Sequence, residues 1–442
     1  AIRLSLVGSE MCIRDSYIRL PITITPLLFL AFLFGQESDY IDFNVESNDD
    51  AYPSSLFIHT MGAEPRYMAI IDSTLNPHWF VNAGQLGLDF KVNHEKISYF
   101  DKTHKSWIIV NEYMVEIDTL ECINGYTADY HDMIVLPNGG YILQAYDSIR
   151  VDMSQIINGG NESALIVTLI LQEFDPNNNL IFEWDAFDHL SIADYTNLDL
   201  TQSFITWTHG NSIEIDNDSN IILSNRKSSE VIKIDRITGA VIWYLGGPNN
   251  QFTFLNDPLS GFNKQHDVRR IDNGNIMIFD NGNEHSPQLS RVVEYSLNEI
   301  NMTAELIWDY SHPLGLFGAT MGSAQRLPNN NTLINWGTLN NYGAIITEVD
   351  YEKNIVMEIE YPLEVKCYKA KKYDWKFFTG LLPGDTNLDN QIDIFDLYNI
   401  SDFIRHNSEN MPLYYLCKYD LNRDGQMTGT DVERIVINIL GG

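Results

Sequence analysis

The chain has 442 residues, 60 acidic against 28 basic side chains and a formal net charge of −32. Nucleic acids and anionic membranes are bound by clustered Lys and Arg, so this charge argues strongly against both as partners. An anionic ligand would need a local positive patch to offset the general field. A chain of this length suits one large domain and an appendage.

The first 16 residues do not resemble a natural leader. When back-translated, the stretch from Leu6 to Ser16 fits a sequencing-library adaptor read in frame. We therefore expect residues 1–16 to be an assembly artefact outside the fold.

An apolar run from Leu20 to Phe34 follows Arg19. It has the length of a signal-peptide core, is short for a membrane span, and contains two prolines that disfavour a spanning helix. We expect a signal peptide at residues 17–35 and an exported mature chain (periplasmic, extracellular or at the cell surface) that does not span the membrane after cleavage.

Beyond Cys12, the odd number of cysteines (Cys122, Cys367 and Cys417) permits at most one internal disulfide, whose pairing stays open.

Short β-branched and aromatic runs separated by Asn, Asp and Gly fill the sequence from about Tyr40 to Tyr373, which predicts many short strands. One repeated unit is an apolar residue followed by Asp or Ser, a polar turn, and a strand that usually carries Trp. Its copies begin at Ile71, Ile117, Phe174, Ile234, Tyr295 and Val349. Six copies at this spacing fit one four-stranded blade each, so we predict an all-β, six-bladed β-propeller at 40–378; a seven-bladed ring or a sandwich are the alternatives.

A second repeated unit places histidines at related positions before an Asn/Gly hairpin turn, a strong hairpin signal. His131 and His266 each stand five residues before the apolar residue that precedes the turn, and His209 stands six before Ile215. A β-bulge would bring His209 into the same register. Because propellers usually bind ligands at one end of their innermost strands, we predict a site in the central channel. Zinc is one possible occupant, although a neighbouring arginine would repel it.

Several segments together resemble the arylsulfotransferase family. They are Trp207-Thr-His209-Gly-Asn211, Ile222-Leu-Ser-Asn-Arg226, Gln265-His266-Asp, Phe279-Asp-Asn-Gly282 and Gly322 to Gly337. This family has a six-bladed propeller and moves a sulfuryl group from a phenolic sulfate to another phenol without a nucleotide. Consistent with that, the sequence contains no phosphate-binding Gly-x-x-x-x-Gly-Lys-[Ser/Thr] loop.

The resemblance implies that His266 is the nucleophile that becomes sulfated. It implies supporting roles in the channel for His131, His209, Asn211 and Arg226. Asn225 stands where a Ser is common in the family. This departure bears on which acceptor phenols the enzyme would use more than on the reaction itself. The chemistry fits these residue types, because a neutral imidazole is a competent nucleophile and fixed donors can stabilise the charge on the sulfuryl oxygens.

The C-terminal region, residues 384–442, contains two twelve-residue loops 35 residues apart, each followed by an apolar helical pattern. Oxygen ligands stand at positions 1, 3, 5, 9 and 12, with position 7 offering its backbone carbonyl, as in calcium loops of the EF-hand kind. The first loop supplies Asp385, Asn387, Asp389, Gln391, Asp393 and Asp396; the second supplies Asp420, Asn422, Asp424, Gln426, Thr428 and Asp431. We predict that these loops bind two Ca²⁺ ions.

With Asp at position 12 and one helix after each loop, the region resembles a type I dockerin. That resemblance implies a cohesin-type scaffold as partner. The sequence thus favours an exported aryl-sulfate sulfotransferase with a dockerin-like tail. Two other hypotheses remain: a propeller that only binds a sulfated or phenolic ligand, and a polysaccharide-processing component.

Overall fold

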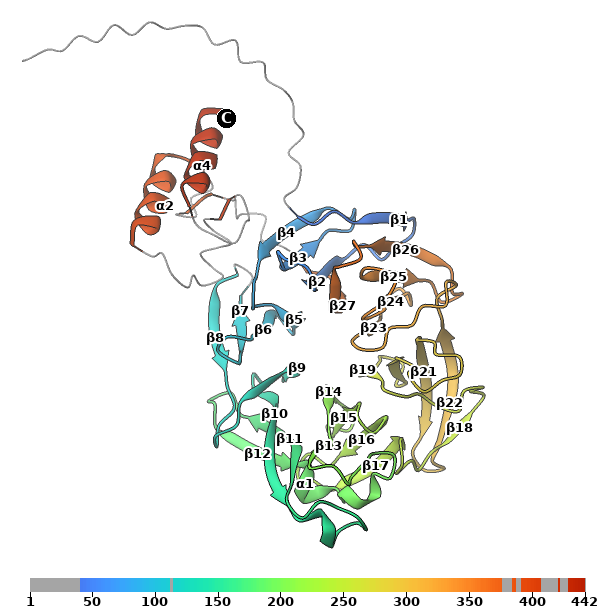
Figure 1. Cartoon of the computed structure of the whole chain (residues 1–442). Coiled ribbons are helices and arrows are strands. Elements are labelled where there is room, and N and C mark those ends of the chain that lie inside the picture. The colour runs from blue at the N-terminus through green and yellow to red at the C-terminus, as the bar shows by residue number, and fades with distance from the viewer. Residues whose placement is uncertain are drawn as a thin grey trace, which may run out of the picture. The chain divides into compact units, whose positions relative to one another are not determined.

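Figure 1 shows the computed structural model of the chain, in which six sheets surround a central axis. The structure describes residues 40–111, 114–375, 384–386, 391–406, 420–421 and 428–441. The predicted artefact and signal peptide lie outside the described residues. Within them, the six-bladed β-propeller predicted from the repeats is confirmed.

Each blade is an antiparallel sheet of four main strands, which follow one another from the axis outward. The first three blades contain β27 (Lys366–Tyr373), β2 (Ser55–Met61), β3 (Tyr67–Ile71) and β4 (Pro77–Asn82); β5 (Leu88–Asn93), β6 (Lys96–Asp101), β7 (Ser106–Val110) and β8 (Glu116–Leu120); and β9 (Ala128–Val135), β10 (Tyr141–Val151), β11 (Ala164–Phe174) and β12 (Leu180–Asp185). The last three contain β14 (Gly210–Ile215), β15 (Ile221–Asn225), β16 (Glu230–Ile234) and β17 (Val241–Gly246); β19 (His266–Arg270), β20 (Ile276–Asp280), β21 (Arg291–Asn298) and β22 (Thr303–Tyr310); and β23 (Ser323–Arg326), β24 (Thr332–Asn335), β25 (Ile345–Val349) and β26 (Ile355–Glu360).

Shorter elements extend the blades. The strand β1 (Asn44–Asn48) pairs antiparallel with β26, whereas β13 (Phe204–Thr206) and β18 (Thr253–Leu255) run parallel to β11 and β22. The third blade and the loop after it also carry the helix α1 (Ala186–His189) and the 3₁₀ turns η1 (Met153–Gln155) and η2 (Ile192–Asp194).

The ring is closed by strands from both ends of the described propeller. The late strand β27 supplies the innermost strand of the first blade, whose other strands come from the start of the chain. The early strand β1 in turn adds to the edge of the last blade. Each closure pairs backbone N–H and C=O groups that a sheet edge would otherwise leave open.

The apolar core lies between neighbouring blades. Six clusters of buried side chains each combine residues from two adjacent blades, such as Trp184 and Leu169 of the third blade with Ile213 and Ile232 of the fourth. Each sheet therefore buries both faces, which explains its nearly continuous apolar runs.

The turn between the third and fourth strand of every blade is built on an Asp or Asn side chain that accepts backbone N–H groups. Four of the six predicted repeat positions coincide with it: Asp72, Asp175, Asp235 and Asp350. The other two predictions were wrong in register, because Ile117 lies inside β8 and Tyr295 inside β21. There, Asn111 and Asn298 take the turn position, and an amide oxygen accepts these bonds as a carboxylate does.

The described part of the C-terminal region contains α2 (Ile394–His406) and α4 (Gly429–Gly441), which pack through the buried Ile400 and Ile435. None of the helices in the described residues has the length and apolarity needed to cross a membrane. Cys122 and Cys367 are both free thiols, and Cys417 lies outside the described residues.

Candidate active site

The hairpin turns of the innermost strands define which residues are equivalent between blades. Leu136, Asp216 and Ile271 each donate their N–H across the same tight turn. Counting back five residues from each reaches His131, Asn211 and His266. The register expected for His209 was therefore wrong: Asn211 occupies the equivalent position, and His209 stands two residues earlier. The error arose because Ile215, rather than Asp216, was taken as the start of the turn.

The residue after each of these three ties its blade to the next. Asp132 accepts the N–H of Ile213, Ser212 that of Val268, and Asp267 that of Ala324, at 3.0, 2.9 and 3.1 Å. Ser323 continues the series by accepting the N–H of Ala370 at 3.1 Å. Each bond joins consecutive blades. The residues that follow His131, Asn211 and His266 therefore fix the positions of these three relative to one another.

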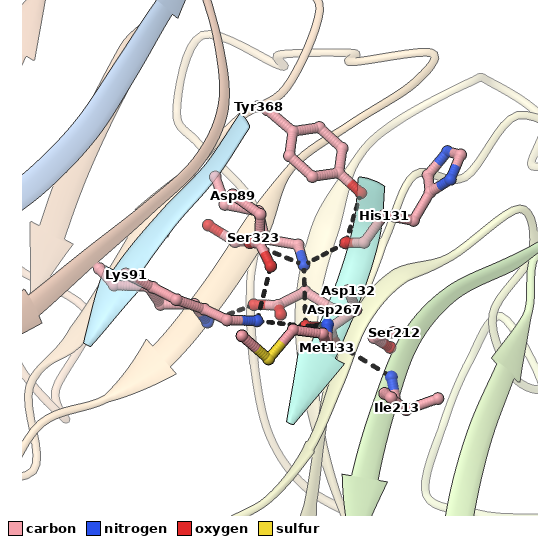
Figure 2. Close-up of polar contacts among 12 residues, drawn as sticks. Asp89, Lys91, His131, Asp132, Met133, Ser212, Ile213, Asp267, Ser323 and Tyr368 are labelled. Atoms are coloured by element: carbon pink, nitrogen blue, oxygen red, sulfur yellow. Dashed lines mark hydrogen bonds and ion pairs between the residues drawn. The ribbon is translucent and has the colours of Figure 1, made fainter. Parts of the chain in front are cut away.

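Charged side chains of the innermost strands form a buried ionic cluster beside His131 (Figure 2). Arg269 bridges Asp132 at 2.8 Å and Asp267 at 2.7 Å, and both carboxylates are fully buried. The other members are Asp89, Lys91, Lys369 and Lys371, each of which forms an ion pair within the cluster. Although burial alone would raise the pKa of Asp267, Lys371 and Arg269 hold it well below its usual range. The Asp267 carboxylate therefore stays ionised at neutral pH.

A cavity of about 580 Å³ opens at the turn end of the innermost strands. Its lining includes Lys91, Arg269, Arg270, Arg326 and Lys371 but none of the three histidines. All five cations have carboxylate partners. The cavity is thus separate from the candidate site.

His266, at the start of β19, is buried and its tautomer is fixed by Asn281. The Asn281 amide Nδ2 donates to the carbonyls of Gly318 at 2.6 Å and Met321 at 2.9 Å. Its Oδ1 must then be the atom that lies 2.6 Å from His266 Nδ1. Since an amide oxygen only accepts, Nδ1 carries the proton and Nε2 keeps its lone pair.

The environment of His266 favours the neutral imidazole. Burial lowers its pKa well below the usual value, and the positive charge of Arg226 lowers it further. His266 thus remains an uncharged base across the physiological pH range, which is the state a nucleophile requires.

His131 and His209 lie against each other, with ring centroids 4.5 Å apart and ring planes nearly perpendicular. His131 Nδ1 is 2.6 Å from Asp129 Oδ1, and the same oxygen accepts the His131 backbone N–H. Burial, and then His131, lower the pKa of His209 to about 3. The His209 ring is therefore poorly suited to hold a positive charge.

Arg226 and His209 are connected through their backbones, because the Arg226 N–H donates to the His209 carbonyl at 2.9 Å. Asn225 Oδ1 accepts the His209 N–H at 2.8 Å. The Asn that replaces a common Ser at this position thus holds His209 in place.

The Arg226 and Asn211 side chains each retain a free polar atom. Arg226 Nη2 donates to Ala319 O at 2.8 Å and Asn211 Nδ2 to Gln265 O at 2.6 Å. Arg226 Nε and Asn211 Oδ1 are buried without a hydrogen-bond partner among the described residues. Buried polar atoms of this kind are costly unless a ligand satisfies them.

The comparisons with known proteins divide the chain into the same two regions that its composition distinguishes. The profile of the family described as Arylsulfotransferase (ASST) matches residues 43–373. The chain belongs to the arylsulfotransferase family. A second profile, Dockerin type I domain, matches residues 383–440. Among curated proteins, none gives a significant match.

Solved structures similar to this arylsulfotransferase-family chain are distant in sequence. A protein of unknown function from Bacteroides caccae has 13% identity and a TM-score of 0.45, covering 73% of this chain and 100% of its own. A streptogramin B lyase has 9% identity and a TM-score of 0.39, with coverages of 75% and 98%. A virginiamycin B lyase from Staphylococcus aureus has 8% identity and a TM-score of 0.37, with coverages of 73% and 89%.

In this arylsulfotransferase-family propeller, His131, Asn211 and His266 lie on the innermost strands of the third, fourth and fifth blades. His209 directly precedes β14 and Arg226 directly follows β15. Two partners were missed by sequence reasoning, Asp129 and Asn281. Asn281 lay within the quoted Phe279-Asp-Asn-Gly282 segment, so a signal for it existed; nothing in the sequence singled out Asp129. No group of three metal-ligating side chains occurs in the part of the chain that the structure describes, which gives the zinc alternative no support.

The described residues of the two C-terminal loops fit calcium. In each loop the position-12 carboxylate is fully buried and accepts the N–H of positions 2 and 9: Asp396 from Thr386 and Asp393, Asp431 from Leu421 and Thr428. The position-1 residues Asp385 and Asp420 are buried as well. Buried carboxylates suit a hard divalent cation. Asn387, Asp389, Asn422, Asp424 and Gln426 lie outside the described residues, whereas Gln391 is described but exposed.

Type I dockerins generally bind calcium and dock onto cohesin-bearing scaffolds. They occur on secreted or cell-surface proteins. The chain thus joins a propeller of a sulfotransferase family to a module of a scaffold-binding family.

Proposed function

We propose that this protein is an exported, nucleotide-independent aryl-sulfate sulfotransferase that works through a sulfo-histidine at His266. The observation that carries the proposal is the contact between His266 Nδ1 and the oriented amide of Asn281. It leaves Nε2 of a buried, neutral imidazole available to attack sulfur.

In the first half-reaction, the Nε2 lone pair forms a bond to sulfur while the bond from sulfur to the phenolic oxygen breaks. The phenolate departs and takes up a proton. The ring then carries a positive charge shared with its Nδ1–H, which the Asn281 oxygen stabilises. In the second half-reaction an acceptor phenol loses its proton, its oxygen bonds to sulfur, and the N–S bond breaks to restore His266.

Arg226 and Asn211 are the proposed binding groups. The free Arg226 Nε is a charged donor suited to a sulfuryl oxygen that gains charge in the transition state. Arg226 also supplies positive charge near His266 in a chain of net charge −32. We place His131 and His209 beside these groups as further polar contacts.

Residues 384–442 form the proposed anchor, which holds two Ca²⁺ ions and attaches the enzyme to a cohesin-type scaffold. The proposed boundaries of the other regions are residues 1–16 for the artefact, 17–35 for the signal peptide and 40–378 for the propeller.

The decisive experiment compares wild type with His266→Ala, using a chromogenic aryl sulfate with and without a phenol acceptor. We expect acceptor-dependent release of the chromogenic phenol by wild type, a sulfo adduct on the peptide that contains His266, and loss of both in the variant. His104→Ala is the control, because that ring is 72% exposed and pairs only with Asp101 among the described residues. Phenol transfer that persists in His266→Ala would contradict the mechanism, and tight binding without turnover would favour a ligand-binding propeller.

A further inference from the structure

His131 and His266 occupy equivalent blade positions, and each has its Nδ1 held at 2.6 Å by an oxygen. The two oxygens differ in charge. Asp129 presents a carboxylate to His131, whereas Asn281 presents a neutral amide to His266. In each ring Nε2 is thus the remaining nitrogen, but the two surroundings respond differently to a proton on that nitrogen.

A carboxylate on Nδ1 stabilises the positive charge that an imidazole gains when Nε2 is protonated, as in catalytic triads. An amide oxygen fixes the tautomer without supplying that charge. Around His266, burial and Arg226 lower the pKa, and each does so by more than the Asn281 hydrogen bond raises it. A carboxylate partner therefore suits a ring that exchanges protons, and an amide partner suits a ring that stays neutral.

We infer that the Nδ1 partners divide the chemistry: Asn281 orients His266 as the nucleophile without adding a negative charge that would favour its protonation, and Asp129 makes His131 the proton carrier between the two phenols. The inference rests on the proposed function and deepens it. Asp129 and Asn281 are positioning residues, since they act through the histidines that they contact.

The proton balance closes with these groups alone. As the phenolate leaves sulfur, the protonated His131 gives its Nε2 proton to the phenolic oxygen and becomes neutral. The acceptor phenol then gives its proton to His131 Nε2 while its oxygen bonds to sulfur, which restores the imidazolium beside Asp129. His266 forms and loses one N–S bond and keeps its Nδ1 proton throughout.

His209 is unsuited to the proton-carrying role, because burial and the neighbouring His131 lower its pKa to about 3. Its ring therefore stays neutral at physiological pH. The titratable and charged groups around the two rings are Asp129, Tyr130, His209, Tyr368 and Lys369 for His131, and Arg226, His209 and His131 for His266.

The test exchanges the charges of the two partners in the full-length protein, with Asn281→Asp and Asp129→Asn. A carboxylate beside His266 should favour its protonated form, so Asn281→Asp is expected to lose about tenfold or more of its activity near pH 6 and to recover at higher pH. Asn281→Leu removes the acceptor without adding charge and should lower the rate without moving the acid limb of the pH profile.

Asp129→Asn should impair proton donation, so its loss should depend on the leaving group. Donors with a poorly leaving, weakly acidic phenol are expected to slow by about 10²-fold or more, and donors with a strongly acidic phenol by much less. A merely structural role would lower both donor classes equally. An unmoved acid limb in Asn281→Asp, or an equal loss with both donor classes in Asp129→Asn, would overturn the inference.

Titration of the ¹⁵N-labelled histidines by NMR separates this inference from the proposed function. A His266 that titrates at higher pH in Asn281→Asp than in wild type supports the role of Asn281 even if aryl sulfates are not turned over. A His266 whose titration is the same in both proteins refutes that role, whatever the enzyme's activity.

Discussion

The Arg226 side chain has unused hydrogen-bonding capacity. Its guanidinium makes one hydrogen bond in the described structure, and its buried Nε has no partner there. Burial lowers its pKa, but an arginine stays charged at any physiological pH. A fixed, partly desolvated cation beside a neutral imidazole suits the proposed binding of a sulfate ester and stabilisation of its transition state.

We expect Arg226→Met to reduce kcat/KM for aryl sulfates by about 10²- to 10³-fold, the usual effect of losing one transition-state donor. The melting temperature should change little, since only the bond to the Ala319 carbonyl is lost. Arg150→Met is the matched control, because Arg150 is exposed and also donates to one carbonyl, that of Ser163. A variant with normal kcat/KM would remove Arg226 from the site.

The partner residues show the limits of sequence reasoning at this scale. His266 and Arg226 were selected by residue type, spacing and family resemblance. The role of Asn281 depends on which way its amide faces, and that is decided by the Gly318 and Met321 carbonyls, some 40 residues later in the chain.

At the scale of strands, Arg269 joins β9 to β19, which belong to non-adjacent blades. It contacts the two carboxylates that immediately follow His131 and His266. The strand between them, β14, is held by the same Asp132 through the Ile213 N–H. The three strands that carry the site thus share one buried polar cluster.

Replacing Arg269 with Met should destabilise the propeller by about 3–5 kcal/mol, because Asp132 and Asp267 would remain buried with less compensation. Denaturant unfolding measures this change. The control is Lys353→Met, whose ion pair with Asp309 is half exposed and should contribute less than about 1 kcal/mol. Equal effects of the two substitutions would show that the cluster does not stabilise the ring.

At the scale of the molecule, the propeller and the C-terminal region gain their stability differently. The ring is closed by β27 and β1, and its core lies between blades. The described part of the C-terminal region has two 13-residue helices whose buried apolar contacts centre on Ile400 and Ile435. So small a core usually needs a metal or disulfides in addition.

Removal of calcium with a chelator should therefore unfold residues 384–442 and leave the melting of the propeller unchanged. Limited proteolysis and circular dichroism follow the two parts separately. We expect Asp431→Ala to lower calcium affinity by about tenfold or more, because the position-12 carboxylate is lost. Glu433→Ala, an exposed position on α4, is the control. An unchanged C-terminal region in the chelator would refute the calcium loops.

The sequence by itself determined the six-bladed architecture, the family and the dockerin module. Hairpin turns, strand runs and calcium loops are local in sequence, and local chemistry such as Asn-Gly turns specifies them directly. Even there, Asn111 and Asn298 escaped detection because an amide can replace a carboxylate in the turn.

Only the tertiary structure decided the register of His209, the partners of His131 and His266, and the ionic cluster beside them. These depend on contacts between blades and between distant loops, where residues far apart in the chain meet. Spacing placed three histidines on the innermost hairpins, but the neighbouring charge that distinguishes one imidazole from another arises only when the ring is closed.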